Sequence, residues 1–162
     1  MLRMAVLSRA GKRDKSNRPH KITRIQNRAH ALYQKGFRIL PRIMTRYLRH
    51  IHCCEISYEA KIASTVVFPH DGFGVVIGNS TVVGEHTKIL HRVTLGGREG
   101  HAAADGRTNP MIGKHVLIGS GAFVLGPVTV GDYARIGAGA VVLEDVPEGC
   151  TVCGIPAKPI DA

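Results

Sequence analysis

The sequence predicts a mostly β protein in which short parallel strands coil into a solenoid behind N-terminal helices. The main observation is a branched aliphatic residue at every sixth position in two runs, the first at Ile77, Val83, Ile89 and Leu95 and the second at Ile112, Ile118, Val124, Val130, Ile136 and Val142. Glycine often follows, and four residues after each aliphatic except Leu95 stands a small or β-branched residue. A period of six fits neither a continuous helix nor one strand. It fits short strands joined by turns, with one aliphatic side chain pointing inward per face.

Each six-residue unit is too small to bury its apolar side alone. Successive units therefore stack and share one continuous core. Repeats of this kind resemble the left-handed parallel β-helix, in which three repeats form one coil. The left hand is implied by that resemblance, because the general rule for parallel crossovers favours the right hand.

The N-terminal segment is strongly basic. Residues 1–50 contain 14 of the 22 Lys and Arg residues and one acid, Asp14. Residues 1–22 show no periodic apolar face, which is typical of a flexible basic tail. The opening apolar stretch is too short for a signal peptide, and no apolar run reaches membrane-spanning length, so we expect a cytoplasmic protein.

Residues 23–54 predict an amphipathic helical cap. Apolar residues recur every three or four positions from Ala29, and a second helix is expected from Pro41 because proline begins helices well. One hypothesis is that the helices cover the open end of the solenoid. Another is that they contact an anionic membrane surface. No recognition motif accompanies the charge, so a nucleic-acid partner is not expected.

Residues 55–162 are expected to form the solenoid, with two interruptions. The phase slips by three residues between Phe68 and Ile77, and His70 lies in this break. The polar, glycine-rich segment 98–111 is predicted to loop out. Of the four cysteines, Cys150 and Cys153 have the spacing of half a metal site. The other two are adjacent, which is poor ligand geometry, so we predict neither a metal nor a disulfide.

The repeat region carries the sequences HDGFGVVIG, ILHRVTLGG, IGSGAFVLG, IGAGAVVLEDVP and GIPAK. These motifs resemble the serine acetyltransferase family of hexapeptide acyltransferases over Glu55 to Ile160. The resemblance is to a short form, with a basic segment of about fifty residues where that family has a large N-terminal helical domain. It implies acetyl-CoA as co-substrate and a homotrimer, or a dimer of trimers, with active sites between adjacent solenoids.

The resemblance also implies catalytic roles. His70 would be the general base, since imidazole titrates closest to neutrality. Glu55 stands where the family has an orienting aspartate, and the N–H of Gly97 matches its oxyanion donor. Ser120 and Ala138 match positions that contact CoA, and Lys158 would hold a CoA phosphate.

Three departures concern the acceptor. The family's Asp-Arg-His-Pro motif falls on a segment in which Thr108 and Asn109 replace the arginine and the histidine. Arg107 lies one place away and is a candidate substitute, and His101 is a candidate for the missing histidine. Pro69 replaces an acid before His70. In the family, the acid pairs with the ammonium of an amino acid and the arginine pairs with its carboxylate. A saccharide acceptor is therefore favoured over L-serine.

Two other classes stay open. A zinc enzyme of the γ-carbonic-anhydrase type would use His86 and His91, which have the right spacing but lie one step out of phase with the repeat. A non-catalytic scaffold would keep the fold and lose the chemistry. The retained His70 and Gly97 argue against the scaffold.

Overall fold

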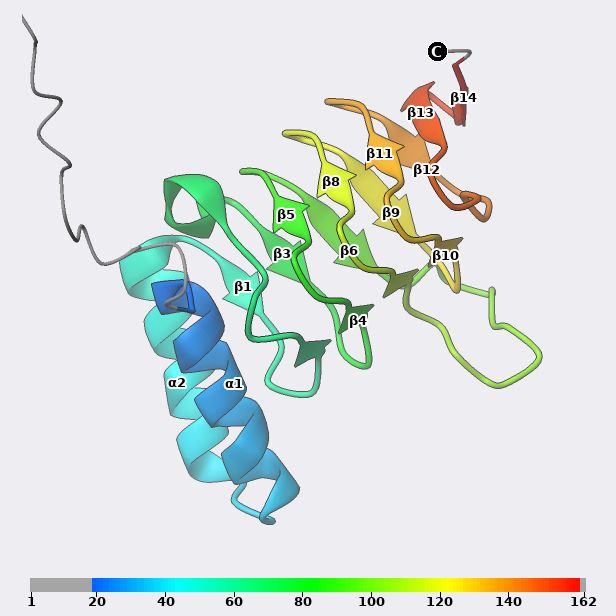
Figure 1. The fold of residues 1–162 in the computed structure, drawn as a ribbon. Coiled ribbons are helices and arrows are strands. Elements are labelled where there is room, and N and C mark those ends of the chain that lie inside the picture. Colours follow the sequence, from blue (N-terminus) through cyan, green and yellow to red (C-terminus); the bar gives the residue numbers. More distant parts are fainter. Residues whose placement is uncertain (1–18, 161–162) are drawn as a thin grey trace, which may run out of the picture.

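The computed structural model describes residues 19–160, in which two helices precede a parallel β-helix (Figure 1). The helices are α1 (Lys21–Gln34) and α2 (Ile39–His52). The first face of the β-helix contains β1 (Glu55–Ile56), β3 (Val76–Ile77), β6 (Thr94–Gly96), β9 (Phe123–Leu125) and β12 (Val141–Val142). The second contains β2 (Lys61–Ile62), β4 (Val82–Val83), β7 (Met111–Ile112) and β10 (Thr129–Val130). The third contains β5 (Lys88–Ile89), β8 (Leu117–Ile118), β11 (Arg135–Ile136), β13 (Thr151–Gly154) and β14 (Ala157–Pro159).

Successive coils pair in parallel, and each inward aliphatic stacks on its counterpart in the next coil. On the first face Ile77 pairs with Leu95, and Leu95 pairs with Val124. All ten aliphatic positions of the repeat are at most 3 % exposed, and the small residues four places later are also buried. Among the strands within residues 19–160, only β14 pairs antiparallel, with β13. The predicted solenoid core and the N-terminal helices are therefore confirmed.

Three edges join the faces, and they position the candidate site. The His70 edge joins the third face to the first and contains His70, His91, Ser120 and Ala138. The loop edge joins the first face to the second and contains Ser80 and residues 97–110. The His86 edge joins the second to the third and contains His86, His115 and Tyr133, whose rings stack at 5.0 Å and 4.9 Å between centroids.

Many edge residues adopt a left-handed backbone. Ser80, His86, Arg92, His115 and Tyr133 have φ between 55° and 59°. Each lies three residues after an inward aliphatic. Because β-carbons usually disfavour this region, the stacked strands on both sides must impose it. The corners are therefore a property of the coil, and they point side chains outward at regular intervals.

The helices cover the first coil through one side of α1. Ile22, Thr23 and Gln26 are fully buried. Thr23 Oγ1 donates to the Val66 carbonyl at 2.8 Å, and Gln26 Nε2 donates to the Ala60 carbonyl at 2.7 Å. These bonds satisfy carbonyls at the end of the solenoid, where a further coil would otherwise pair.

The helix boundaries differ from those expected. Helix α1 begins at Lys21 rather than Thr23, and α2 begins at Ile39, two residues before Pro41. Proline is tolerated there because first-turn N–H groups lack helical partners in any case. Most of the predicted basic tail, residues 1–18, lies outside the described residues.

Both interruptions of the repeat occur where the sequence places them. The phase break contains a short 3₁₀ turn, η2 (Pro69–Gly72), in which His70 and Asp71 have φ of 57° and 53°. The outward loop runs from 97 to 110, one residue earlier than predicted, because Met111 already belongs to β7. Figure 1 shows this loop extending away from the solenoid.

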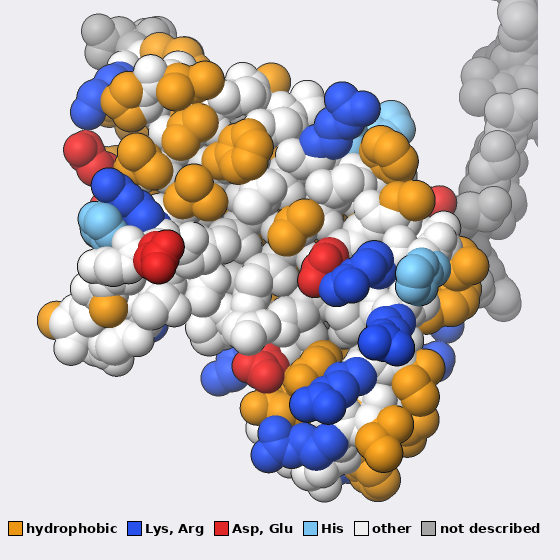
Figure 2. Space-filling view, turned by 180° about the vertical axis from the view of Figure 1, so that it is seen from behind, with side chains coloured by type: hydrophobic (Ala, Val, Ile, Leu, Met, Phe, Trp, Pro, Cys, Tyr) orange, Lys and Arg blue, Asp and Glu red, His pale blue; other side chains and the backbone are white. Residues whose placement is uncertain are grey.

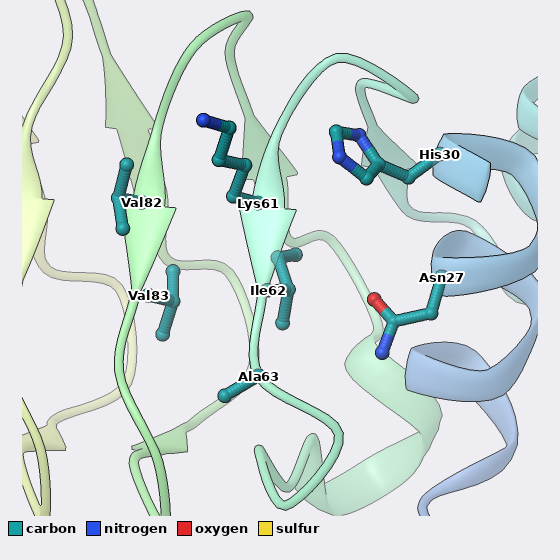
Figure 3. Close-up of a pocket in the computed structure, with 7 residues that line it drawn as sticks. All are labelled: Asn27, His30, Lys61, Ile62, Ala63, Val82 and Val83. Carbon is teal, nitrogen blue, oxygen red and sulfur yellow. The ribbon is translucent and has the colours of Figure 1, made fainter. Parts of the chain in front are cut away.

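A cleft of about 380 Å³ separates α1 from the second face (Figure 3). Asn27 and His30 of α1 line it opposite Lys61 of β2 and Val82 of β4. None of the predicted site residues lies there. The cleft is therefore separate from the candidate site.

Alternate residues of β4 test the repeat directly. Val83 is 2 % exposed in the core, whereas Val82 beside it is half-buried on the outer surface. We expect Val83→Ala to lower the free energy of unfolding by about 2–3 kcal/mol. The matched change Val82→Ala should cost less than about 1 kcal/mol. Urea unfolding at one protein concentration measures both, and equal losses would contradict the assigned faces.

Candidate active site

The predicted catalytic histidine lies exposed on the His70 edge. Its left-handed backbone in η2 points the ring away from the solenoid, where it contacts the ring of His91 edge to face at 5.2 Å between centroids. His91 occupies the same corner one coil later. Its Nδ1 is buried and has no hydrogen-bond partner within residues 19–160. His91 is a site residue that the sequence analysis missed.

The predicted CoA contacts continue along the same edge. The N–H of Gly121 donates to the His91 carbonyl at 3.0 Å, and the N–H of Gly139 donates to the Ser120 carbonyl at 2.9 Å. His91, Ser120 and Ala138 therefore occupy equivalent corners of successive coils. A β-carbon on Gly119 would lie 2.5 Å from the backbone nitrogen of Ala138, so these corners approach each other closely.

The predicted orienting carboxylate does not contact the histidine. Glu55 accepts a hydrogen bond from Arg49 Nη2 at 2.6 Å, and no Glu55–His70 bond forms in the described part of the chain. Both partners are about half exposed, so this ion pair contributes little to stability. The predicted dyad is therefore not formed in this structure. Glu55 instead lines a cleft of about 270 Å³ between α2 and the first face, with Thr45, Ser57 and Tyr58.

The loop edge holds a second group of predicted residues. Gly97 and Asn109 approach each other: a β-carbon on Gly97 would lie 3.8 Å from Asn109 Oδ1. Asn109 Nδ2 donates to Thr108 Oγ1 at 3.1 Å and to Ser80 Oγ at 3.4 Å. Asn109 also packs over Gly78, where a β-carbon would lie 2.6 Å from its Oδ1.

Arg107 is held inside the loop. Its Nε donates to Asp105 Oδ2 at 2.7 Å, and its backbone N–H donates to Asp105 Oδ1 at 3.0 Å. The backbone and side-chain hydrogen bonds from Arg107 hold the pKa of Asp105 below its ordinary value. An anion that binds Arg107 must therefore compete with Asp105.

His101 shares a cleft with Gly97. This cleft has a volume of about 370 Å³ and is lined by residues 97–102 and Thr108. His101 Nδ1 lies 2.9 Å from the Glu99 carbonyl oxygen, so Nδ1 carries the proton and Nε2 is the acceptor in the neutral ring. The arrangement puts a second imidazole beside the predicted oxyanion donor.

Lys158 lies apart from both groups. It belongs to β14, and its ammonium pairs with Glu144 at 3.5 Å. The candidate zinc ligands are separated as well. His86 stacks on His115 at the His86 edge, whereas His91 contacts His70 at another edge. The two histidines are therefore not co-ligands in one chain, and residues 19–160 contain no group of three metal-ligating side chains.

Comparisons with known proteins agree with this architecture. Residues 109–144 match the family described as bacterial transferase hexapeptide (six repeats). A serine acetyltransferase of Helicobacter pylori strain J99 is 44 % identical over 132 residues, covering 82 % of this chain and 75 % of the relative. A serine acetyltransferase of Synechococcus elongatus is 41 % identical over 132 residues, covering 82 % of this chain and 52 % of the relative. This chain thus spans only about half the length of some curated relatives.

Solved structures are similar over a larger share of the chain. Neisseria gonorrhoeae serine acetyltransferase in complex with serine aligns with a TM-score of 0.79 at 34 % identity, covering 86 % of this chain and 55 % of that one. A serine acetyltransferase in complex with CoA aligns with a TM-score of 0.78 at 32 % identity, with the same coverage. The left-handed coiling expected from the sequence is thereby confirmed.

Two glycines of the first face test the packing around Asn109. A methyl group at residue 78 must displace the Asn109 side chain, whereas at residue 96 the nearest atom, of Leu125, is 4.0 Å away. We expect Gly78→Ala to shift the side-chain amide signals of Asn109 in a ¹H–¹⁵N spectrum. Gly96→Ala should leave these signals in place. Equal shifts in both variants would show that Asn109 does not pack on Gly78.

Proposed function

Because this chain belongs to the serine acetyltransferase-like family of hexapeptide-repeat proteins, we propose that it transfers acetyl from acetyl-CoA to an acceptor hydroxyl. The observation that carries the proposal is the His70 edge. There an outward-pointing histidine lies on the same line of corners as Ser120 and Ala138. The small side chains on this line leave backbone groups accessible to a long, extended thioester.

His70 acts as the general base in this proposal. Its imidazole takes the proton of the acceptor hydroxyl while the oxygen attacks the thioester carbon. The N–H of Gly97 stabilises the resulting oxyanion. Collapse of this intermediate breaks the C–S bond, and the departing CoA sulfur takes the proton back from His70. His91, packed against His70, holds the ring in place.

The reaction needs more than one copy of the chain. An oxyanion donor acts within about 3 Å of the developing charge. Within one chain His70 and Gly97 belong to different edges, and the first face lies between them. We infer a trimer in which the His70 edge of one copy meets the loop edge of the next. Analytical ultracentrifugation tests this assembly.

L-Serine is our first candidate for the acceptor. Relatives are named serine acetyltransferases, and one was solved in complex with serine. Arg107 would bind the serine carboxylate after leaving Asp105, and His101 would stand in for the family's second histidine. Both lie on the loop that carries Gly97.

A saccharide hydroxyl is the second candidate. Its support comes from the residues of this chain that differ from the family's acceptor-binding groups. Thr108 and Asn109 offer neutral hydrogen-bonding groups where a zwitterion needs charged ones. Pro69 stands directly before His70, where the family has an acid that would pair with the serine ammonium. A neutral polyol would form hydrogen bonds with the hydroxyl of Thr108 and the amide of Asn109, and it carries no charge that needs a partner.

Two histidines with matched backbones test the general base. His70 and His86 both have left-handed φ, 57° and 56°, which asparagine also tolerates. We expect His70→Asn to lower the rate of CoA release from acetyl-CoA by about 10²–10⁴. His86→Asn, on another edge, should retain the wild-type rate. Comparable losses in both variants would remove His70 from the mechanism.

A panel of L-serine and neutral sugars, each with acetyl-CoA, identifies the acceptor. If serine is the acceptor and Arg107 its carboxylate ligand, Arg107→Ala should raise the KM for serine about 10-fold or more and leave that for acetyl-CoA unchanged. Lys114→Ala, which breaks a comparable surface ion pair with Glu85, is the control. CoA release driven by sugars alone would establish the second candidate. CoA binding without release by any acceptor would favour a non-catalytic scaffold.

A further inference from the structure

Helix α2 presents a wide apolar arc to solvent. Ile39, Ile43 and Tyr47 follow one another at spacings of four and are 73 %, 55 % and 44 % exposed. Leu40 and Ile51 widen the same arc, and Phe37 precedes it in the turn between the helices. Single exposed apolar residues are common, but a contiguous group on one helix marks an interaction surface.

The exposed arc is separate from the side of α2 that contributes to the protein core. The opposite side of α2 already packs on the protein, with Pro41 and Leu48 buried. Thr45 Oγ1 donates to the Ile56 carbonyl at 3.5 Å on that side. Turning the arc inward would expose Leu48, so α2 presents its apolar residues outward.

A row of arginines borders the arc. Arg42, Arg46 and Arg49 recur at three and four residues and are exposed. From Lys21 to His52 the two helices and the turn between them contain eight Lys or Arg residues and no Asp or Glu. Figure 2 shows Lys and Arg side chains in a row beside hydrophobic ones on the helical part of the molecule. The surface is therefore apolar and cationic together.

We propose that the outer face of α2 binds the surface of an anionic lipid bilayer. The aliphatic side chains enter the boundary between headgroups and acyl chains, and the arginines pair with lipid phosphates. Tyr47 suits this boundary because its ring is apolar and its hydroxyl is polar. No helix within residues 19–160 is long and apolar enough to cross a bilayer, so α2 lies in the plane of the surface.

Charge disfavours a second copy of the same face as the occupant. Two such faces in contact would bring arginines together, and neither helix carries an acid to compensate. A bilayer with anionic headgroups supplies both the apolar layer and the opposite charge.

The binding mode would also orient the cleft that contains Glu55. Thr45 and Arg49 of α2 form one wall of that cleft, and Arg49 belongs to the arginine row as well. Docking α2 would thus bring the mouth of the cleft close to the headgroups. Arg49 is left unchanged in the experiment below because it pairs with Glu55.

The test is sedimentation of the full chain with vesicles. One set contains equal parts of phosphatidylglycerol and phosphatidylcholine, and the other contains phosphatidylcholine alone. We expect binding to the first set only. Replacing Arg42 and Arg46 with alanine should lower the partition coefficient about 25-fold, at about fivefold for each arginine. Replacing Ile39 and Ile43 with aspartate should lower it at least about 10-fold.

Controls separate the face from other causes. Ile155→Asp introduces one aspartate at a highly exposed isoleucine outside the helices and should bind like wild type. Absence of wild-type binding would overturn the proposal. Undiminished binding by either double variant would overturn it too, because another part of the chain would then be responsible. If Ile39→Asp with Ile43→Asp instead dissociates the assembly in analytical ultracentrifugation, the face is a subunit contact and the proposal fails.

Discussion

The stacking of one inward aliphatic side chain per face is the constraint on which the rest of this structure depends. Because each coil pairs in parallel register with the next, an aliphatic such as Leu95 lies between Ile77 and Val124. The register in turn forces the chain to turn at fixed intervals. At these corners even Ser80 and His115 adopt a left-handed backbone. The cost, about 1–2 kcal/mol per residue, is offset by the burial on both sides.

Because the core pattern repeats in every coil, the corners place outward-pointing groups in lines along the surface. Side chains that are far apart in sequence, such as His91 and Ser120, recur one above the other because a coil advances the chain by one strand spacing, about 4.8 Å. Close backbone approach is part of the same geometry. A β-carbon at Gly119 or Gly78 would collide with the next coil or with Asn109. The glycines are thus required by packing, and the groups proposed for catalysis occupy positions that the coil leaves exposed.

The two N-terminal helices cover the open end of the solenoid. The first coil of a solenoid has no neighbour on one side, and α1 covers it with Ile22, Thr23 and Gln26. Helix α2 buries Pro41 and Leu48 against the protein, which leaves an apolar arc and an arginine row outside. Stability of the cap and properties of its outer surface therefore rest on different residues of the same two helices.

The sequence by itself determined the core of this protein. Its six-residue period identified every inward aliphatic from Ile77 to Val142, and its slip between Phe68 and Ile77 located the turn that holds His70, because burial repeats with the coil. Tertiary structure alone decided which groups meet. His91 contacts His70 although 21 residues separate them, since one coil of 18 residues and the three of the slip return the chain to the same corner. Glu55 pairs with Arg49, and Arg107 with Asp105, because exposed side chains follow local charge and no period governs them. The separation of His70 from Gly97 likewise depends on which of three edges each corner joins, and this emerges only when the coils are closed around one core.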